Sequence, residues 1–254
     1  MSSLTQQSVA DFLAPRVTLT GFASPDQFDD APGGHHPGDI LHGAATVVVY
    51  GIAVPRGILH SPQRSLYALH RSYHSVYPLL DEISLSLANH LEQAGELAVP
   101  APSYAPMVFH EAEPWGVLSL KHSAVKAGLG AFGHNQLVHH PDYGTMLRFG
   151  AVVTTADLGT SPTMDYEPCP EGCTLCMDAC PSESIGEDGF MKMKCLGHTI
   201  KHAIYPLALN SPDAVRHIER VVNTAGYNYW LKCHECLTVC PSNQGRFAAG
   251  QDNN

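Results

Sequence analysis

The hydrophobic pattern of the chain predicts a buried strand followed by a long helix. Residues 45–53 read ATVVVYGIA, a continuous run of strand length that is rich in β-branched residues. Beyond it, apolar residues recur every three or four positions from Leu66 until Gly95, which is the spacing of an amphipathic helix. Ser61 and Pro62 are typical of a helix start, so we expect the helix to begin there, with a kink at Pro78.

Two shorter elements follow the long helix. After a proline-rich loop, the pattern predicts a helix at 117–126 and a second strand at 149–154. Gly128, Gly130 and Gly133 lie between these two elements and end the helix. Strands that are separated by helices predict an α/β fold rather than a helical bundle.

The cysteines are confined to the last third of the chain. Residues 1–168 contain none, and all eight lie between Cys169 and Cys240. A disulfide scaffold is typical of a small secreted domain, which this chain of 254 residues does not resemble. The spacing gives two runs, Cys-x3-Cys-x2-Cys-x3-Cys-Pro from Cys169 and Cys-x2-Cys-x3-Cys-Pro from Cys233, with Cys195 between them.

This spacing predicts two 4Fe–4S clusters with crossed ligands. Two runs that end in Cys-Pro are typical of a bacterial two-cluster ferredoxin, in which the last cysteine of each run ligates the other cluster. The first set of ligands is then Cys169, Cys173, Cys176 and Cys240. The second set is Cys180, Cys195, Cys233 and Cys236, and no cysteine remains.

A pair of tetrahedral zinc sites is the alternative interpretation of paired cysteines. Zinc sites need neither Cys-Pro endings nor interleaved runs, so the spacing favours clusters. One departure is that three residues rather than two separate Cys169 from Cys173. Pro170 and Gly172 favour a wider turn that still delivers both thiolates. If one ligand fails, we expect it to be Cys169, which would leave a 3Fe–4S or labile cluster.

Charge and composition argue against two classes of partner. The formal net charge is −10, and the 14 Lys and Arg residues form no dense run. Nucleic-acid affinity rests largely on clusters of such residues, so we expect no nucleic-acid partner. No stretch approaches the ~20 apolar residues of a membrane span, and the N-terminal residues carry no positively charged leader. We therefore expect a cytoplasmic protein without a membrane partner.

The order of these segments resembles the epoxyqueuosine reductase and reductive dehalogenase superfamily. The cysteine layout with Lys194-Cys195 is the most specific part of this resemblance, which extends over nearly the whole chain. The other matching segments are HPGDILHGAATVVVYGIAV (36–54), YALHRSYH (67–74), HSAVKAGLGAFGHNQLV (122–138), PDYGTMLRFGAVVTTADL (141–158) and the closing CPSN.

The resemblance implies two domains and two kinds of cofactor. Residues 1–160 would form a nitroreductase-like α/β core that holds a cobalamin, and residues 161–254 a ferredoxin-like module with two 4Fe–4S clusters. The module would feed electrons to the cobalt. We therefore expect an iron–sulfur oxidoreductase that takes electrons from an external donor such as a ferredoxin or a flavodoxin, with a small-molecule substrate or a corrinoid as its partner.

The glycine segment is a candidate cofactor-binding element. Gly128, Gly130 and Gly133 would let the backbone approach a flat ligand closely, although they equally suit a loop that simply turns. Their Gly-x-Gly-x-x-Gly spacing follows a helix rather than a strand, which argues against a dinucleotide site.

Three further candidates come from the resemblance. His134 and Asn135 lie where the family usually has Lys-Asn, and Asn135 would bond a corrinoid amide. Tyr143 matches a family tyrosine and would donate a proton or contact the edge of the cofactor. Tyr73 continues the apolar stripe of the long helix, which favours core packing over chemistry.

Two departures from the family pattern concern the substrate. Epoxyqueuosine reductases place a proton-donating aspartate about fourteen residues before the glycine segment, and this offset falls on Pro114. Glu113 would replace it with a one-residue shift, because a carboxyl beside Trp115 could have a raised pKa and act as a general acid. An exposed loop with solvated acids is the alternative. The chain also ends fourteen residues after Cys240, without the helical repeats of some tRNA-acting members, which again argues against a tRNA substrate.

Three functions remain open at this point. The first is a corrinoid-dependent reductase, in which Glu113 or Tyr143 supplies a proton and the cofactor carries the redox chemistry. The second is an electron-transfer protein that reduces or handles a corrinoid or another tetrapyrrole for a partner. The third is a reductase of the same fold that binds a flavin instead.

Overall fold

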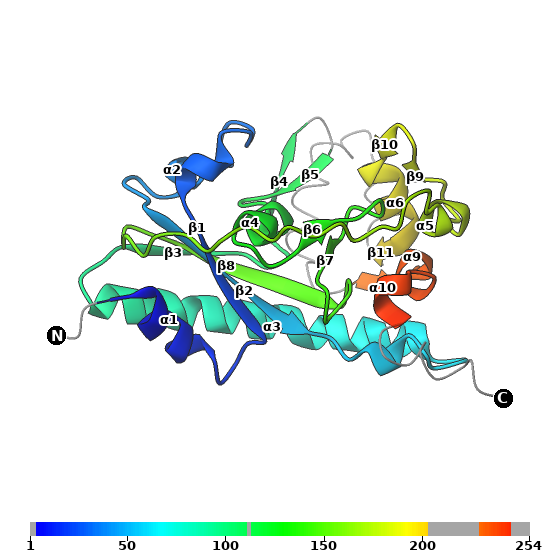
Figure 1. The fold of residues 1–254 in the computed structure, drawn as a ribbon, viewed down its shortest axis with the longest axis horizontal. Helices are drawn as coiled ribbons and strands as arrows, with labels where there is room; N and C mark the ends of the chain where they lie inside the picture. Colours follow the sequence, from blue (N-terminus) through cyan, green and yellow to red (C-terminus); the bar gives the residue numbers. More distant parts are fainter. Residues whose placement is uncertain (1–3, 111–112, 203–228, 245–254) are drawn as a thin grey trace.

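A four-stranded antiparallel sheet forms the centre of the protein (Figure 1). The computed structural model describes residues 4–110, 113–202 and 229–244. The sheet has the order β1-β2-β8-β3, and each neighbouring pair is antiparallel. Its strands are β1 (Leu19–Ala23), β2 (Thr46–Ala53), β8 (Leu147–Thr154) and β3 (Ala98–Ala101).

The two central strands, β2 and β8, pair along their whole length, from Thr46 opposite Thr154 to Ala53 opposite Leu147. In the middle of this ladder Tyr50 lies opposite Gly150. A Cβ atom at Gly150 would lie 2.7 Å from the Tyr50 ring, so this position requires glycine. The absent side chain of Gly150 therefore provides the space that the tyrosine occupies.

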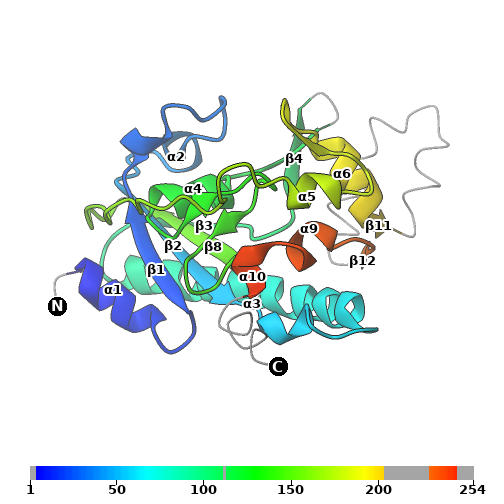
Figure 2. The same ribbon diagram turned by 45° about the vertical axis from the view of Figure 1, so that its right-hand side comes forward.

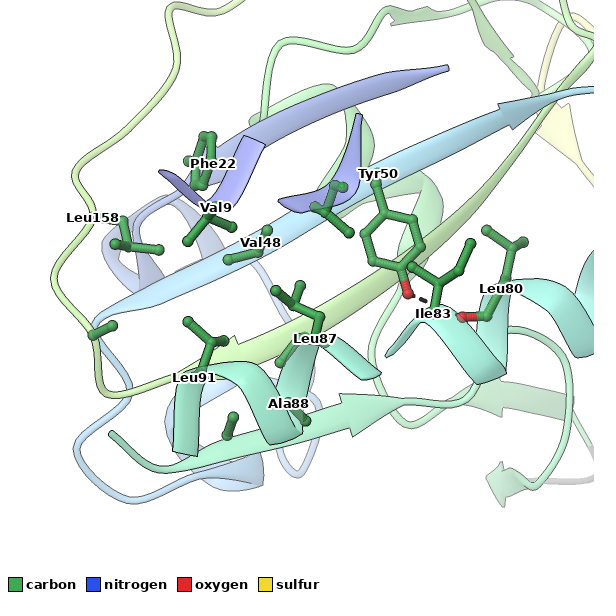
Figure 3. Close-up of a cluster of buried hydrophobic side chains, with 14 residues drawn as sticks. Val9, Phe22, Val48, Tyr50, Leu80, Ile83, Leu87, Ala88, Leu91 and Leu158 are labelled. Atoms are coloured by element: carbon green, nitrogen blue, oxygen red, sulfur yellow. Dashed lines mark hydrogen bonds between the residues drawn. The ribbon is translucent and has the colours of Figure 1, made fainter. Parts of the chain in front are cut away.

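The long helix α3 (Ser65–Gln93) covers one face of the sheet. Its buried residues pack on the side chains of β2 that point to this face, among them Val48 and Tyr50 (Figure 3). The Tyr50 hydroxyl donates a hydrogen bond to the Leu80 carbonyl oxygen at 3.0 Å and also contacts the Ser84 hydroxyl. The short helix α1 (Gln6–Leu13) packs on the same face and closes the core at its edge.

The opposite face of the sheet carries smaller elements. Val47 and Val49 point to this face because side chains alternate along a strand, and they pack with α4 (Leu120–Lys126). Around this helix lie short elements, which are α2 (Pro37–Ile40) and the hairpins β4 (Met107–His110) with β5 (Glu113–Gly116) and β6 (Ala131–Phe132) with β7 (Val138–His139).

The cysteine-rich elements gather at one end of the molecule, which Figure 2 brings forward. They are α5 (Leu175–Asp178), β9 (Ile185–Gly186), β10 (Gly189–Phe190), α6 (Lys192–Thr199), β11 (Ile200–His202), β12 (Tyr229–Leu231), α9 (Glu235–Thr238) and α10 (Pro241–Gln244). Tyr229, Leu231 and Leu237 pack with Leu69 and Tyr73 of α3, so this end shares a hydrophobic cluster with the core.

A buried asparagine joins the same two parts. The side chain of Asn243 on α10 accepts hydrogen bonds from the Thr145 backbone N–H at 2.8 Å and from the Thr145 hydroxyl at 3.1 Å. Its amide group donates to the Leu237 carbonyl oxygen at 2.7 Å. A Cβ atom at Gly144 would lie 2.3 Å from the Asn243 side-chain oxygen, so this contact requires a glycine on the core side.

The structure confirms the predicted strands and most of the predicted helices. The strands predicted at 45–53 and 149–154 correspond to β2 and β8. The prediction that α3 begins at Ser61 and Pro62 is wrong, because a turn occupies 62–64 and the helix begins at Ser65. The helix continues through Pro78 to Gln93. Among the described helices, none is long and apolar enough to cross a membrane.

The packing of α3 on the sheet generates a stability prediction. Leu87 is fully buried against the sheet, whereas Leu85 on the same helix is 57% exposed. We expect Leu87→Ala to lower the free energy of unfolding by about 2–5 kcal/mol, because it removes buried surface and leaves a cavity. The matched control Leu85→Ala should change it by less than about 0.5 kcal/mol. Urea unfolding of identically prepared proteins measures both, and equal losses would contradict this packing.

Candidate functional site

The eight cysteines lie at one end of the molecule, and the thiols that act on Cys176 and Cys236 fit the two predicted sets, which stay a prediction. Burial raises the pKa of Cys176 to about 11, and the neighbouring thiols of Cys169, Cys240 and Cys173 raise it further. Burial likewise raises the pKa of Cys236 to about 12, and its neighbours include the other three members of the second set, namely Cys195, Cys233 and Cys180. Contacts between α5 and α9 hold the first and the second cysteine run side by side.

The wide turn at the start of the first run forms as predicted. The Cys173 backbone N–H donates to the Pro170 carbonyl oxygen at 3.1 Å, and Gly172 has a φ of +70°. Glycine adopts this left-handed conformation at little cost. The three-residue spacing therefore still places Cys169 beside Cys173 and Cys176.

Several sulfur atoms accept hydrogen bonds. Cys180 Sγ lies 3.3 Å from both the backbone N–H and the hydroxyl of Ser184, and 3.5 Å from the Ser182 hydroxyl. Burial alone would raise the pKa of Cys180, but these hydrogen bonds outweigh it and lower the pKa to about 6. Cys169 Sγ accepts from the His134 backbone N–H at 3.4 Å, and Cys240 Sγ lies 3.1 Å from the Ser242 hydroxyl. At neutral pH Cys180 is therefore a thiolate, the form that binds metal.

In the part of the chain that the structure describes, no three His, Cys, Asp or Glu side chains are close enough together to hold one metal ion. A structural zinc ion needs four ligand atoms within about 2.3 Å of one point. The thiols as they lie do not provide that geometry.

A cavity of about 420 Å³ lies between the core and the cysteine-rich end. All four cysteines of the second set line it, and those of the first set do not. Four tyrosines from three segments contribute to its walls, and these are Tyr73, Tyr77, Tyr104 and Tyr229. Its volume lies within the usual range for small-molecule sites, and its walls combine aromatic rings with few polar groups. We call this space the first cavity.

Asn135 presents an unused hydrogen-bond donor at the first cavity. Its side-chain oxygen accepts from the Leu137 backbone N–H at 3.2 Å and lies 3.0 Å from His139 Nε2. Its side-chain Nδ2 is buried and has no partner among the described residues. A buried amide donor without a partner costs about 1–3 kcal/mol, so a ligand in the cavity that accepts from it would gain that amount.

His139 fixes this orientation of Asn135. The imidazole is 1% exposed, and its Nδ1 lies 2.9 Å from the Ser242 hydroxyl. Burial lowers the pKa of His139 to about 4, and His134 lowers it further. His139 is therefore neutral near pH 7, with Nε2 donating to the Asn135 oxygen.

A second cavity, of about 450 Å³, adjoins the first. The two cavities share the lining residues Lys121, Gln136 and Phe190. Aromatic and basic side chains dominate the second cavity, and they are Phe28, Trp115, Phe132, Phe190, Lys121, Lys126, Lys192, His35 and His122. Among the described residues that line it, Asp30 is the one acid, and it forms an ion pair with Lys126 at 2.8 Å.

Lys192 of α6 holds the β4–β5 hairpin at the edge of the second cavity. Its Nζ donates to the Pro114 carbonyl oxygen at 3.0 Å and lies 3.3 Å from a Glu113 carboxylate oxygen. The same ammonium group lies 4.0 Å from the centroid of the Trp115 ring. Three contacts therefore join this hairpin to the helix that carries Cys195.

The structure does not bring the other predicted cofactor residues to the first cavity. Gly128 and Gly130 have φ values of +74° and +147°, and added Cβ atoms there would meet the Pro162 and His139 carbonyl oxygens at 2.2 and 2.3 Å. An added Cβ atom at Gly133 would meet the His139 ring. These glycines approach their own chain, and their role toward a flat ligand stays a prediction.

His134, Tyr143 and Glu113 also lie outside the first cavity. His134 Nδ1 lies 3.0 Å from the Cys173 carbonyl oxygen, so this residue contacts the first cysteine run. Tyr143 packs against His140 and the hydrophobic cluster beneath α4. Glu113 is engaged with Lys192. Catalytic roles for Tyr143 and Glu113 stay predictions.

Sequence reasoning missed two basic residues at the site, Arg148 and Lys192. Arg148 lines the first cavity and lies 4.3 Å from the centroid of the Tyr73 ring. The sequence did mark Arg148, because it is a single charged residue at the start of an otherwise apolar strand, where charged residues are rare. No sequence signal pointed to Lys192, because its partners are 78 residues distant in the chain.

The chain was compared with known protein families and with curated proteins. No protein-family model matches the chain. An epoxyqueuosine reductase from Lactococcus garvieae is 28% identical over 216 residues, which cover 81% of this chain and 54% of that protein. The enzyme of the same name from Gloeobacter violaceus is 30% identical over 181 residues, covering 70% and 49%. The resemblance inferred from the sequence is confirmed. The chain spans about half the length of the curated relatives it matches.

Solved structures show that the mixed α/β fold is that of epoxyqueuosine reductases. The enzyme from Bacillus subtilis, with its catalytic aspartate loop swung out of the active site, matches with a TM-score of 0.64 at 20% identity, covering 95% of this chain and 66% of that one. An epoxyqueuosine reductase with a tRNA-Tyr stem loop gives 0.63 at 19% identity with the same coverage. A catabolic reductive dehalogenase in complex with 3-bromo-4-hydroxybenzoic acid gives 0.51 at 15% identity, covering 92% and 29%.

The tRNA-bound structure corrects one prediction. An epoxyqueuosine reductase of this fold is solved with a tRNA stem loop, so the prediction that excluded nucleic acid and favoured a small-molecule partner is wrong. The physical reason is that net charge sums the whole surface, whereas binding depends on local charge. Here Lys121, Lys126 and Lys192 gather at one cavity of a chain whose net charge is −10.

The contacts of Lys192 generate a prediction for the hairpin. We expect Lys192→Met to increase hydrogen exchange of the described β4 and β5 amides about tenfold, because it removes a hydrogen bond, an ion pair and a cation–π contact worth about 1–2 kcal/mol together. Lys194→Met is the matched control, since Lys194 lies on the same helix and pairs with Glu183 instead. Exchange measured by mass spectrometry checks this, and an unchanged hairpin in Lys192→Met would contradict it.

Proposed function

We propose that this protein is an iron–sulfur reductase that holds two 4Fe–4S clusters and a corrinoid and reduces a modified nucleoside carried on tRNA. The observation that carries the proposal is that the second set of cysteines and the donor group of Asn135 line one cavity. The second 4Fe–4S cluster and the corrinoid would then both lie at the first cavity. The similarity to epoxyqueuosine reductases supports the same reading.

The two sets of cysteines are proposed as the cluster ligands. Their division into two groups of four supports this, since a 4Fe–4S cluster takes four thiolates. The hydrogen bonds to Cys180 Sγ also fit a cluster, because such bonds tune the potential of iron–sulfur centres. We accordingly propose residues 161–254 as a ferredoxin-like module and residues 1–160 as a nitroreductase-like core.

The first cavity is proposed as the corrinoid site. The donor set fits this group, because a corrinoid carries amides around its rim and Asn135 Nδ2 is a buried donor without a partner among the described residues. The tyrosine rings offer apolar surface to a flat macrocycle. When bound, a corrinoid would supply the redox chemistry of its cobalt, while the protein orients it and excludes water.

The second cavity is proposed as the site of the nucleoside. Aromatic side chains stack on bases and lysines attract phosphates, and both kinds of residue line this cavity. It adjoins the first cavity through Lys121, Gln136 and Phe190, so a bound base would lie next to the cofactor. The relatives named epoxyqueuosine reductase supply the nucleoside class, an epoxide-bearing modification of tRNA.

A second candidate function rests on one observation. Pro114 stands where the related reductases have a proton-donating aspartate. Pro114 lines the second cavity where a side-chain acid would be expected, and Glu113 is engaged with Lys192. A protein without its own proton donor could still pass electrons to a corrinoid or another tetrapyrrole for a partner. Turnover of tRNA separates the two functions.

The crossed ligand assignment has a direct test in iron content. We expect Cys169, Cys173 and Cys176→Ser together to reduce reconstituted iron from eight atoms to about four per chain, because the first cluster loses three ligands. Adding Cys240→Ser to this triple variant should change nothing further, whereas adding Cys180→Ser should remove the remaining cluster. The opposite result for these two additions would show that the runs do not cross.

The proposed cofactors and substrate require anaerobic reconstitution. With iron, sulfide and hydroxocobalamin, we expect eight irons and one cobalt per chain after desalting, and less retained cobalt in Asn135→Ala. The loaded protein should then convert epoxyqueuosine in tRNA, read by nucleoside mass spectrometry. Eight irons with flavin in place of cobalt would support the flavin-binding alternative. Cobalt without turnover would favour the electron-transfer function, and fewer than four irons would contradict the cluster proposal.

A further inference from the structure

Arg148 occupies an unusual position for a charged residue. It stands at the start of β8, one residue after a leucine that is 2% exposed and two before the glycine opposite Tyr50. Its Nη1 donates to the carbonyl oxygens of Thr145 and Leu147, at 3.1 and 2.5 Å. Its guanidinium group lies over the Tyr73 ring and lines the first cavity. Among the described residues, no carboxylate forms an ion pair with it.

The buried guanidinium group of Arg148 needs a compensating negative charge. Burial lowers the pKa of Arg148 to about 10, so the guanidinium remains protonated at neutral pH. The negative forms of Tyr229 and Cys236 oppose this lowering. Burial raises the pKa of Tyr229 to about 12, so its phenol is neutral near pH 7. Arg148 lines the first cavity together with all four cysteines of the second set, whose thiolates would supply that charge as cluster ligands.

Lys121 is a second cation that lines the first cavity. Lys121 lies in the first turn of α4, and its Nζ donates to the Gln136 carbonyl oxygen at 2.8 Å. Burial lowers the pKa of its ammonium group, and the thiolate of Cys195 acts in the opposite direction. Two cations of the core therefore line the same cavity as the four cysteines of the second set.

The cysteines of the first set do not line this cavity. The charges that act on Cys176 come from the other three thiols of its own set. Hydrogen bonds reach this set from the His134 backbone N–H and the Ser242 hydroxyl, as they reach the second set from Ser182 and Ser184. Among the described residues, the second set therefore shares a cavity with Arg148 and Lys121, and the first set does not.

We propose that Arg148 and Lys121 are the counter-charges of the second cluster and raise its reduction potential above that of the first. This inference rests on the proposed cluster ligands. A 4Fe–4S cluster with four thiolates is an anion that gains one further negative charge when it accepts an electron. A nearby cation in a cavity with low dielectric constant therefore stabilises the reduced form more than the oxidised form. Both residues act through the cluster, whose reduced form they stabilise, and need not contact a substrate.

Potentiometric titration of the reconstituted protein tests the proposal. The variant that lacks Cys169, Cys173 and Cys176 isolates the second cluster, and one that lacks Cys195, Cys233 and Cys236 isolates the first. In the first of these backgrounds, we expect Arg148→Met to lower the equilibrium constant for reduction at least tenfold, about 59 mV for a one-electron couple. Lys121→Met should act in the same direction. In the other background, neither substitution should change the potential.

Two controls separate charge from packing. Arg148→Lys keeps the charge and should retain most of the potential, whereas a shift equal to that of Arg148→Met would overturn the proposal. Arg16→Met removes the same charge from a surface ion pair with Glu82 and should leave both potentials unchanged. Unchanged or raised potentials in both Arg148→Met and Lys121→Met would also overturn it, as would equal shifts of the two clusters. Failure to assemble any cluster in the unsubstituted chain would instead contradict the proposed function.

Discussion

The pairing of β2 with β8 is the constraint on which the rest of the structure depends. This ladder carries Tyr50 into the core that α3 covers, and it fixes where β8 begins. The residues just before and at that start, Thr145 and Arg148, reach the cysteine-rich end and the first cavity respectively. Because side chains alternate along a strand, a shift of one residue in the register would exchange the faces of the sheet and remove Arg148 from the cavity. The geometry of the site is therefore set by hydrogen bonds made well away from it.

The two parts of the chain contribute different kinds of group to the site. The cysteine-rich end supplies sulfur atoms and the hydrogen bonds around them, whereas the core supplies aromatic rings, an unused amide donor and two cations. Neither part encloses the first cavity alone. The electrostatic environment of the second set of cysteines is consequently determined by residues more than 30 positions distant in sequence, which an isolated ferredoxin-like segment would lack.

The sequence predicted the elements with strong local signals. The run at 45–53 and the stripe from Leu66 to Leu91 have periodicities that only one type of element satisfies, and Cys-Pro endings restrict how the runs can combine. The start of α3 was misjudged because Pro62 suits a turn as well as a helix. The cavity walls could not be predicted, because Tyr73, Tyr104 and Tyr229 meet only after the chain has folded. The glycine segment was ambiguous for the same reason, since only packing shows that its close partners are Pro162 and His139.

Asn243 has a consequence for how the protein responds to oxygen. It lies three residues after Cys240, and its side chain joins α10 to Thr145 at the wall of the first cavity. Oxidative loss of a cluster held by Cys240 would release the backbone that keeps Asn243 in place, and Thr145 would lose its partner. Damage to the electron carrier would thus reach the cofactor cavity mechanically, and the protein would lose its ligand site along with its redox centre. If Cys240 holds a cluster as proposed, loss of that cluster would therefore also change the shape of the first cavity.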